Sequence, residues 1–176
     1  TGDVLCFSET ALNPGDTPVL RGFTGIFGSR GKGSGVAIYY NSEKLSLSNW
    51  KTKCNDEFQA IYADFNFFHI IAVYRSPRVS NSARNVFEAL KPLLIKKKQI
   101  FVVGDFNLSP VSSPFAAAMQ GLGYKQLINK PTHALGNILD HLYTNDLISL
   151  HDVTLQPVYF SDHDAVGGAF KLDQDT

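Results

Sequence analysis

The sequence predicts one domain over residues 1–176, of the α/β or α+β class, in which short strands build a sandwich and helices are few. Short apolar stretches recur along the chain and several alternate, whereas helical spacing occurs in only two segments. The chain is 44% apolar over 176 residues, which is enough for one substantial core and little for two. Several connections are short enough for hairpins, which disfavours a wholly parallel winding.

The expected strands are apolar segments bounded by glycine, proline, asparagine or serine. In chain order they cover residues 3–7, 36–40, 45–50, 58–65, 67–73, 100–103, 138–143, 153–158 and 165–170. The fourth and fifth are separated by Asn66 alone, which predicts a tight hairpin. The sixth is followed directly by Gly104, where we expect it to end.

Two segments are expected to be helical. The first begins at a cap formed by Ser80 or Asn81, and its apolar side chains recur at helical spacing, namely Val86, Phe87, Leu90, Leu93 and Leu94. Pro92 lies inside this pattern, so a kink or an early end is expected. The second helix covers residues 114–122 and is ended by glycines.

The composition argues against a membrane or secreted protein. No run of about eighteen apolar residues is present, so no membrane span is expected. The first residues lack the basic and apolar regions of a secretory signal. Cys6 and Cys54 show no metal-binding spacing, and two buried thiols are favoured over a disulfide or a zinc site. A reducing, intracellular compartment is the expectation, with the nucleus as the predicted location.

The charges are balanced in total but not along the chain. Formal net charge is zero, with 16 basic and 16 acidic residues. Residues 21–98 hold 13 Lys and Arg against 5 Asp and Glu, whereas residues 99–176 hold 3 against 8. Two interpretations stay open: solvated faces of opposite sign, or a polyanion-contacting surface beside a carboxylate-rich pocket.

Polar residues follow several of the apolar strands, where open sheets often present their working side chains. They are Glu9, Asp105 with Asn107, Asp140, and Asp162 with His163. Each has an ordinary alternative, as a surface acid, turn chemistry or a polar loop. Carboxylates that converge from distant segments favour a shared divalent cation, and a donor set rich in oxygen and poor in sulfur suits Mg²⁺. With a histidine beside an aspartate, the set fits phosphodiester hydrolysis.

The order of the motifs SET, VYRSP, GDFN, PTH…LDHLYTN and SDHDAV resembles the endonuclease/exonuclease/phosphatase superfamily. Within it, the sequence is most similar to the apurinic-endonuclease-like domains of non-LTR retrotransposons, which accompany a reverse transcriptase. The resemblance covers about residue 3 to residue 170. It implies a four-layer α/β/β/α sandwich of two mixed sheets, like DNase I, with the active site at one edge and Mg²⁺ or Mn²⁺ as cofactor.

The resemblance also implies roles for the residues in these motifs. Glu9 is expected to bind the metal, assisted by Asp162. Asp105 and Asn107 are expected to place or activate the attacking water and to hold the phosphate. His163 is expected to bind the scissile phosphate or to act as acid or base, with Asp140 holding its ring. Tyr74, in VYRSP, is expected to contact the phosphate.

The chain departs from the family pattern at its start. Members usually begin with an asparagine-bearing strand and a helix ahead of the SET segment, whereas only three residues precede VLCF here. An N-terminally truncated domain is therefore the expectation. The sheet is expected to expose an edge beside that strand, which a second copy of the chain would complete by strand addition or a swap.

The leading hypothesis is a DNA endonuclease that leaves a 3′-hydroxyl for target-primed reverse transcription. Arg30, Lys32, Arg75 and Arg78 are the expected contacts to the DNA backbone, with solubilising surface charge as the alternative. A second hypothesis is a catalytically dead domain of the same fold that serves in binding or oligomerisation. A third keeps the chemistry but changes the substrate to phosphoinositide or nucleotide phosphoesters.

Overall fold

The computed structural model describes residues 4–8, 21–28, 36–54, 58–66, 68–75, 82–96, 98–106, 113–127, 140–145, 153–162 and 165–174. It describes the backbone alone for Phe7, Ser8, Ser82, Ala83, Asp105, Asp140 and residues 153–162 and 165–174.

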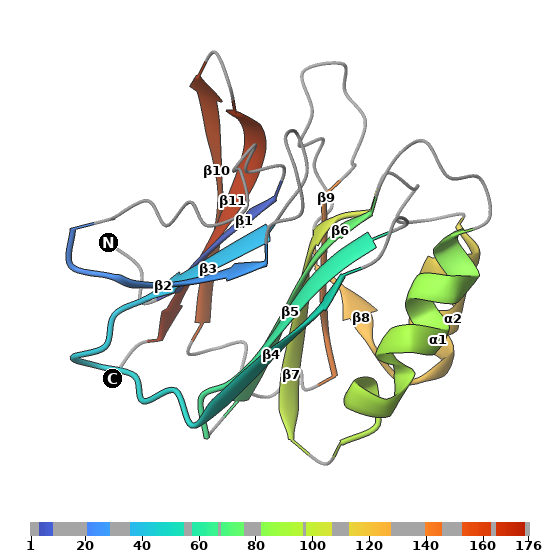
Figure 1. Cartoon of the computed structure of the whole chain (residues 1–176). Coiled ribbons are helices and arrows are strands. Elements are labelled where there is room, and N and C mark those ends of the chain that lie inside the picture. The colour runs from blue at the N-terminus through green and yellow to red at the C-terminus, as the bar shows by residue number, and fades with distance from the viewer. Residues whose placement is uncertain are drawn as a thin grey trace.

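Two sheets lie face to face, and both described helices cover the outer face of the second one (Figure 1). The first sheet has the order β10 (Val153–Asp162), β11 (Ala165–Gln174), β1 (Val4–Ser8), β3 (Val36–Tyr40), β2 (Thr24–Gly28). The second has the order β4 (Asn49–Cys54), β5 (Phe58–Asp64), β6 (Phe68–Arg75), β7 (Gln99–Asp105), β9 (Asp140–Thr144), β8 (Lys125–Gln126). The helices are α1 (Ser82–Leu94) and α2 (Pro114–Gly121). The predicted α/β sandwich is confirmed.

One crossover sets the direction of the second sheet. β6, α1 and β7 form a β–α–β unit in which β6 and β7 pair in parallel. The other described strand pairs are antiparallel. The predicted hairpin of β5 and β6 is confirmed, and Asn66 turns the chain with φ of 71°. Pro92 is exposed inside α1, which ends two residues later at Leu94. Neither described helix is long and apolar enough to cross a membrane.

Several strand boundaries differ from the sequence prediction. The chain turns at residues 41–48, where Leu45 N–H bonds the Asn41 carbonyl, so β4 runs over 49–54 and not 45–50. β2 and β8 were not predicted, because TGIFG offers a short apolar signal and Lys125–Gln126 offers none. β7 continues through Gly104 to Asp105, one residue past its predicted end.

The expected open edge beside β1 is not found. β1 pairs with β3 on one side and with β11 on the other, antiparallel in both cases. Because the long β11 supplies the neighbouring backbone groups, β1 is an interior strand of the first sheet. The reason given for a second copy completing that edge is therefore removed.

The core consists of two apolar layers. One lies between the sheets and includes Ile38, Ile61 and Ile70; the other lies between the second sheet and the helices and includes Ile71 and Leu90. Alternate residues of β6 enter the two layers, which explains why all eight of its residues are buried and why its middle, residues 70–73, is continuously apolar.

The two cysteines lie in different surroundings. Both are free; Cys6 is buried between the sheets, whereas Cys54 is exposed. The prediction of two buried thiols is wrong for Cys54, because β4 is an edge strand whose six residues are all exposed.

A polar cluster closes the turn between β5 and β6. The Asp64 carboxylate accepts from the Asn66 N–H at 2.9 Å and lies 3.2 Å from His69 Nε2. The Tyr62 hydroxyl lies 3.0 Å from His69 Nδ1. The His69 side chain is 2% exposed. Burial lowers the pKa of His69 most; Asp64 raises it, and Lys98 and Lys96 lower it, so that the pKa is below its ordinary 6.5.

Leu90→Ala is expected to lower the free energy of unfolding by about 2–5 kcal/mol, because it leaves a cavity under α1. Leu90 is fully buried, whereas Lys91 beside it is exposed. Lys91→Ala is the matched control and is expected to change stability by less than about 0.5 kcal/mol. Urea denaturation measures both, and equal effects would contradict the packing described for α1.

His69 is expected to make stability fall as the pH drops. Its folded pKa lies below the unfolded value of about 6.5, so the unfolded chain binds the proton more readily. Its contribution is complete above about pH 6.5 and is lost as pH falls from there through the folded pKa. His69→Asn is expected to flatten the unfolding free energy between about pH 7.5 and pH 5.5. A wild-type curve already flat over that range would contradict the burial of a neutral imidazole.

Candidate functional site

Three predicted site residues form one row across the second sheet. Tyr74 on β6 pairs with Asp105 on β7, and Asp105 pairs with Asp140 on β9. Paired residues on neighbouring strands have Cα atoms about 4.5–5.5 Å apart. The fold therefore brings together residues that lie far apart in the sequence, as the motif analysis predicted for these three. We call them the rim row.

The first sheet ends at the same side of the molecule. β1 ends at Ser8, directly before Glu9 in the sequence, and β10 ends at Asp162, opposite the start of β11 at Ala165. Because β1 runs antiparallel to β11, its end lies toward the side where β10 and β11 are joined. In Figure 1 this side is the upper one, where β6 and β7 also end and β9 begins.

The remaining predicted residues are not placed to the same degree. Glu9, Asn107, His163, Arg30, Lys32 and Arg78 lie outside the described residues, and Asp105, Asp140 and Asp162 are described by their backbone. Their assigned roles stay predictions.

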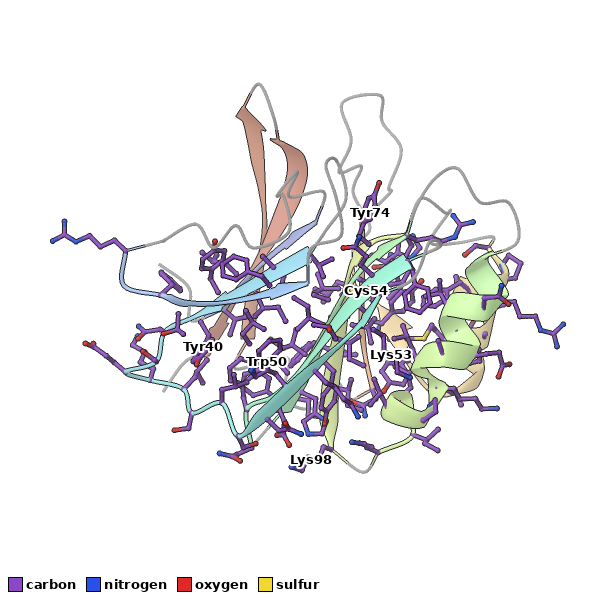
Figure 2. The ribbon with its side chains drawn as sticks, viewed as in Figure 1. Tyr40, Trp50, Lys53, Cys54, Tyr74 and Lys98 are labelled. Carbon is purple, nitrogen blue, oxygen red and sulfur yellow. The ribbon has the colours of Figure 1, made fainter. Side chains whose placement is uncertain are left out.

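Tyr74 is the member of the rim row whose side chain is described. Its ring belongs to the apolar layer between the sheets and is 5% exposed. Figure 2 shows it at the upper end of β6, with the phenol directed past the strand ends. The buried ring therefore fixes the direction in which its hydroxyl is presented at the rim.

Gly104 determines how closely β7 approaches β6 below the rim row. Its φ is +156°, and a Cβ placed on it would lie 1.8 Å from the carbonyl oxygen of Val73. No side chain fits that space, so only glycine lets the two strands pair up to Asp105. From its sequence, Gly104 was expected only to end the strand, because a requirement set by the neighbouring strand leaves no local signal.

Buried side chains hold the backbone directly after Asp105 in place. Arg75 Nη1 donates a hydrogen bond to the Phe106 carbonyl at 3.1 Å, and Arg75 is 5% exposed. The Phe106 ring is fully buried, with centroids 4.5 Å from Phe115 and 5.0 Å from His141. The contact that the structure describes for Arg75 is thus internal, and its predicted contact to DNA stays a prediction.

His141 and Tyr143 are buried polar residues near the rim row that were not singled out from the sequence. Both are buried on β9, and His141 Nδ1 lies 2.7 Å from the Tyr143 hydroxyl. Burial raises the pKa of Tyr143, so the phenol keeps its proton. The polar residues at alternate positions in DHLYT were the available signal, since a buried histidine needs a partner.

A divalent cation suits the chemistry of the rim row. Asp105 and Asp140 are direct cross-strand neighbours, and like charges in that position repel each other unless a cation or proton intervenes. Oxygen donors without sulfur are the ligands that Mg²⁺ prefers. In the part of the chain whose side chains are described, no three His, Cys, Asp or Glu residues form a metal-binding group.

Two packed sheets with helices outside, and acids from separate strands at one rim, define the fold of a sandwich-type phosphoesterase. The chain belongs to the endonuclease/exonuclease/phosphatase family, whose profile matches residues 1–163. Members of this family are hydrolases that act on phosphodiester bonds. Among curated protein sequences, none matches this chain.

Solved structures share the fold at low sequence identity. The 3′ phosphatase NExo from Neisseria, bound to a product DNA hairpin, has a TM-score of 0.67 at 13% identity, covering 97% of this chain and 89% of its own. An AP endonuclease from Archaeoglobus fulgidus has 0.66 at 14%, covering 97% and 89%. The endonuclease domain of TRAS1, a telomere-specific non-LTR retrotransposon, has 0.61 at 15%, covering 89% and 81%. These likenesses show the fold.

Gly104→Ala is expected to destabilise the protein by about 2–4 kcal/mol, because the added Cβ meets the Val73 carbonyl and the φ is unfavourable. Gly121→Ala is the matched control, since a Cβ there meets nothing within 4 Å. The control is expected to be neutral or slightly stabilising at the end of α2. Thermal denaturation of both variants measures the difference, and similar melting temperatures would contradict the close approach of β6 and β7.

Proposed function

We propose that this chain is a divalent-metal-dependent DNA endonuclease that leaves a 3′-hydroxyl, as in target-primed retrotransposition. The observation that carries the proposal is the rim row, in which Tyr74, Asp105 and Asp140 adjoin one another at the side where β1 and β10 also end. Membership of the endonuclease/exonuclease/phosphatase family supports phosphodiester chemistry, and three structures of the same fold are a DNA-bound phosphatase and two endonucleases.

The proposed chemistry assigns each demand of hydrolysis to a residue. Glu9, with help from Asp162, would hold Mg²⁺ or Mn²⁺ at the rim, and the ion would supply positive charge to the phosphate and the leaving oxygen. Asp105 and Asn107 position the attacking water, and either Asp105 or His163 takes its proton. Asp140 orients the His163 ring.

Tyr74 has a separate part in the proposal, as a fixed hydrogen-bond donor to the phosphate. Its ring is clamped between the sheets, so its hydroxyl loses little freedom when a phosphate binds. A preorganised donor of this kind is worth more in the transition state than a mobile one.

The proposed partner is DNA, contacted through its backbone by Arg30, Lys32 and Arg78, because the buried Arg75 already bonds the Phe106 carbonyl. A formal net charge of zero gives the domain little long-range attraction for a polyanion. Binding is therefore expected to need local basic contacts or an attached domain. A nuclear location belongs to the same proposal, since the substrate is DNA.

Asp105→Asn and His163→Ala are each expected to lower the rate of supercoiled-plasmid nicking in Mg²⁺ by roughly 10²–10⁴-fold, because each removes a group assigned to proton transfer or phosphate binding. Glu88→Gln is the matched control, an exposed acid on α1 away from the rim row. Extension of the nick by a DNA polymerase tests for the 3′-hydroxyl.

The outcomes of this assay separate the candidate functions. If wild type, Asp105→Asn and His163→Ala nick DNA equally, all with wild-type melting temperatures, the endonuclease hypothesis is wrong. No nicking in any divalent metal would favour the catalytically dead module. Hydrolysis of inositol or nucleotide phosphoesters without nicking would favour the third candidate, so all three substrates belong in the panel.

A further inference from the structure

Three lysines gather at the end of the second sheet opposite the rim row. Lys51 on β4 and Lys96 after α1 place their Nζ atoms 5.3 Å and 4.9 Å from the centroid of the Tyr62 ring. Lys98, just before β7, lies 3.8 Å from Asp64 Oδ1 and is 44% exposed. Figure 2 shows Lys98 at the lower end of the molecule and Tyr74 at the upper end. We call these three residues the basic end.

The positive charge at the basic end exceeds the negative charge beside it. Asp64 is the acid that the structure records in contact with this group, and it is shared by His69 at 3.2 Å and the Asn66 N–H at 2.9 Å as well as Lys98. Lys98 and Lys96 both act to lower the pKa of the buried His69, after burial itself. The cluster therefore has a positive local potential although the whole chain is neutral.

The arrangement differs from dispersed surface lysines. Segments distant in sequence direct two ammonium groups onto one aromatic ring, and Lys96 Nζ also lies 3.4 Å from the Tyr62 hydroxyl. The ring attracts each cation, but the two cations repel each other. Lys51 and Lys53 also lie on an exposed edge strand, where charged side chains discourage pairing with a strand of another chain. This is the simpler structural explanation for the charge on β4. That explanation does not account for Lys96 and Lys98, which lie off the strand.

We propose that Lys51, Lys96 and Lys98 form a contact surface for the phosphodiester backbone of a nucleic-acid strand other than the one at the rim row. Lysines act as point charges that bind phosphates without reading bases, and a phosphate would relieve the repulsion between them. Binding at this surface does not require cleavage at the rim row, and only the presence of a second strand there rests on the proposed function. Tyr74 of the rim row and His69 beside the basic end are five residues apart on β6, which is roughly 17 Å at about 3.3 Å per residue.

Binding is tested with fluorescein-labelled single-stranded DNA and RNA of about 20 nucleotides in EDTA, over a series of salt concentrations. Lys51→Gln/Lys96→Gln is expected to weaken binding and to reduce the slope of log K against log salt by about 1.4, at about 0.7 per lost contact. Lys91→Gln/Lys125→Gln is the matched control: both lysines are exposed and lie outside the basic end. DNA and RNA are expected to respond alike, because the contacts are to phosphate.

The pKa of His69, read by NMR, reports on this end of the molecule alone. A bound phosphate beside the lysines is expected to raise it, while DNA at the rim row lies beyond the screening length of about 10 Å at 0.1 M salt. The chain has five histidines, and the His69→Asn spectrum assigns the signal. The rise is expected in the wild type and the control, and not in Lys51→Gln/Lys96→Gln.

An unchanged His69 pKa at saturating oligonucleotide, or a salt slope equal in both double variants, would overturn the proposal. A response to polyglutamate but not to nucleic acid would also overturn it, in favour of an acidic protein segment.

Discussion

The parallel pairing of β6 and β7 up to Asp105 is the contact on which the rim row depends. Gly104 permits it, because a side chain at that position would occupy the place of the Val73 carbonyl oxygen. The pairing aligns Tyr74 with Asp105, and β9 then adds Asp140 from the other side. Arg75 and Phe106 continue the constraint past the strand end through the bond to the Phe106 carbonyl. Backbone pairing thus sets the relative positions of the three rim-row residues.

β6 and β7 carry different kinds of polar residue at the two ends of the second sheet. β6 begins near the buried His69 and ends at Tyr74, and β7 begins after Lys98 and ends at Asp105. The middle residues of both strands contribute only apolar side chains to the two core layers. An apolar strand core therefore separates the His69 cluster from the rim row.

How much the sequence predicted depended on the strength of the local signal. Continuous apolar stretches located β3, β5 and β6 well, because strands buried on both faces leave that pattern. β4 was misplaced, since its exposed residues carry no pattern and the preceding LSLS alternates by chance. Motif order placed Tyr74, Asp105 and Asp140 together through resemblance. The need for glycine at 104 and the stacking of Phe106 with His141 arise from tertiary contacts, so local reasoning had no access to them.

The structure places residues of the basic and the acidic segment of the chain at different ends of the second sheet. The basic segment 21–98 supplies β4 and the turn before β7, where Lys51, Lys96 and Lys98 lie at one end. The acidic segment 99–176 supplies Asp105 and Asp140 at the other end. Because β6 and β7 run parallel and the chain crosses over by α1, the basic turn is forced to the end opposite the acids. The parallel crossover therefore places the described lysines of the basic half and Asp105 and Asp140 of the acidic half at opposite ends of the second sheet.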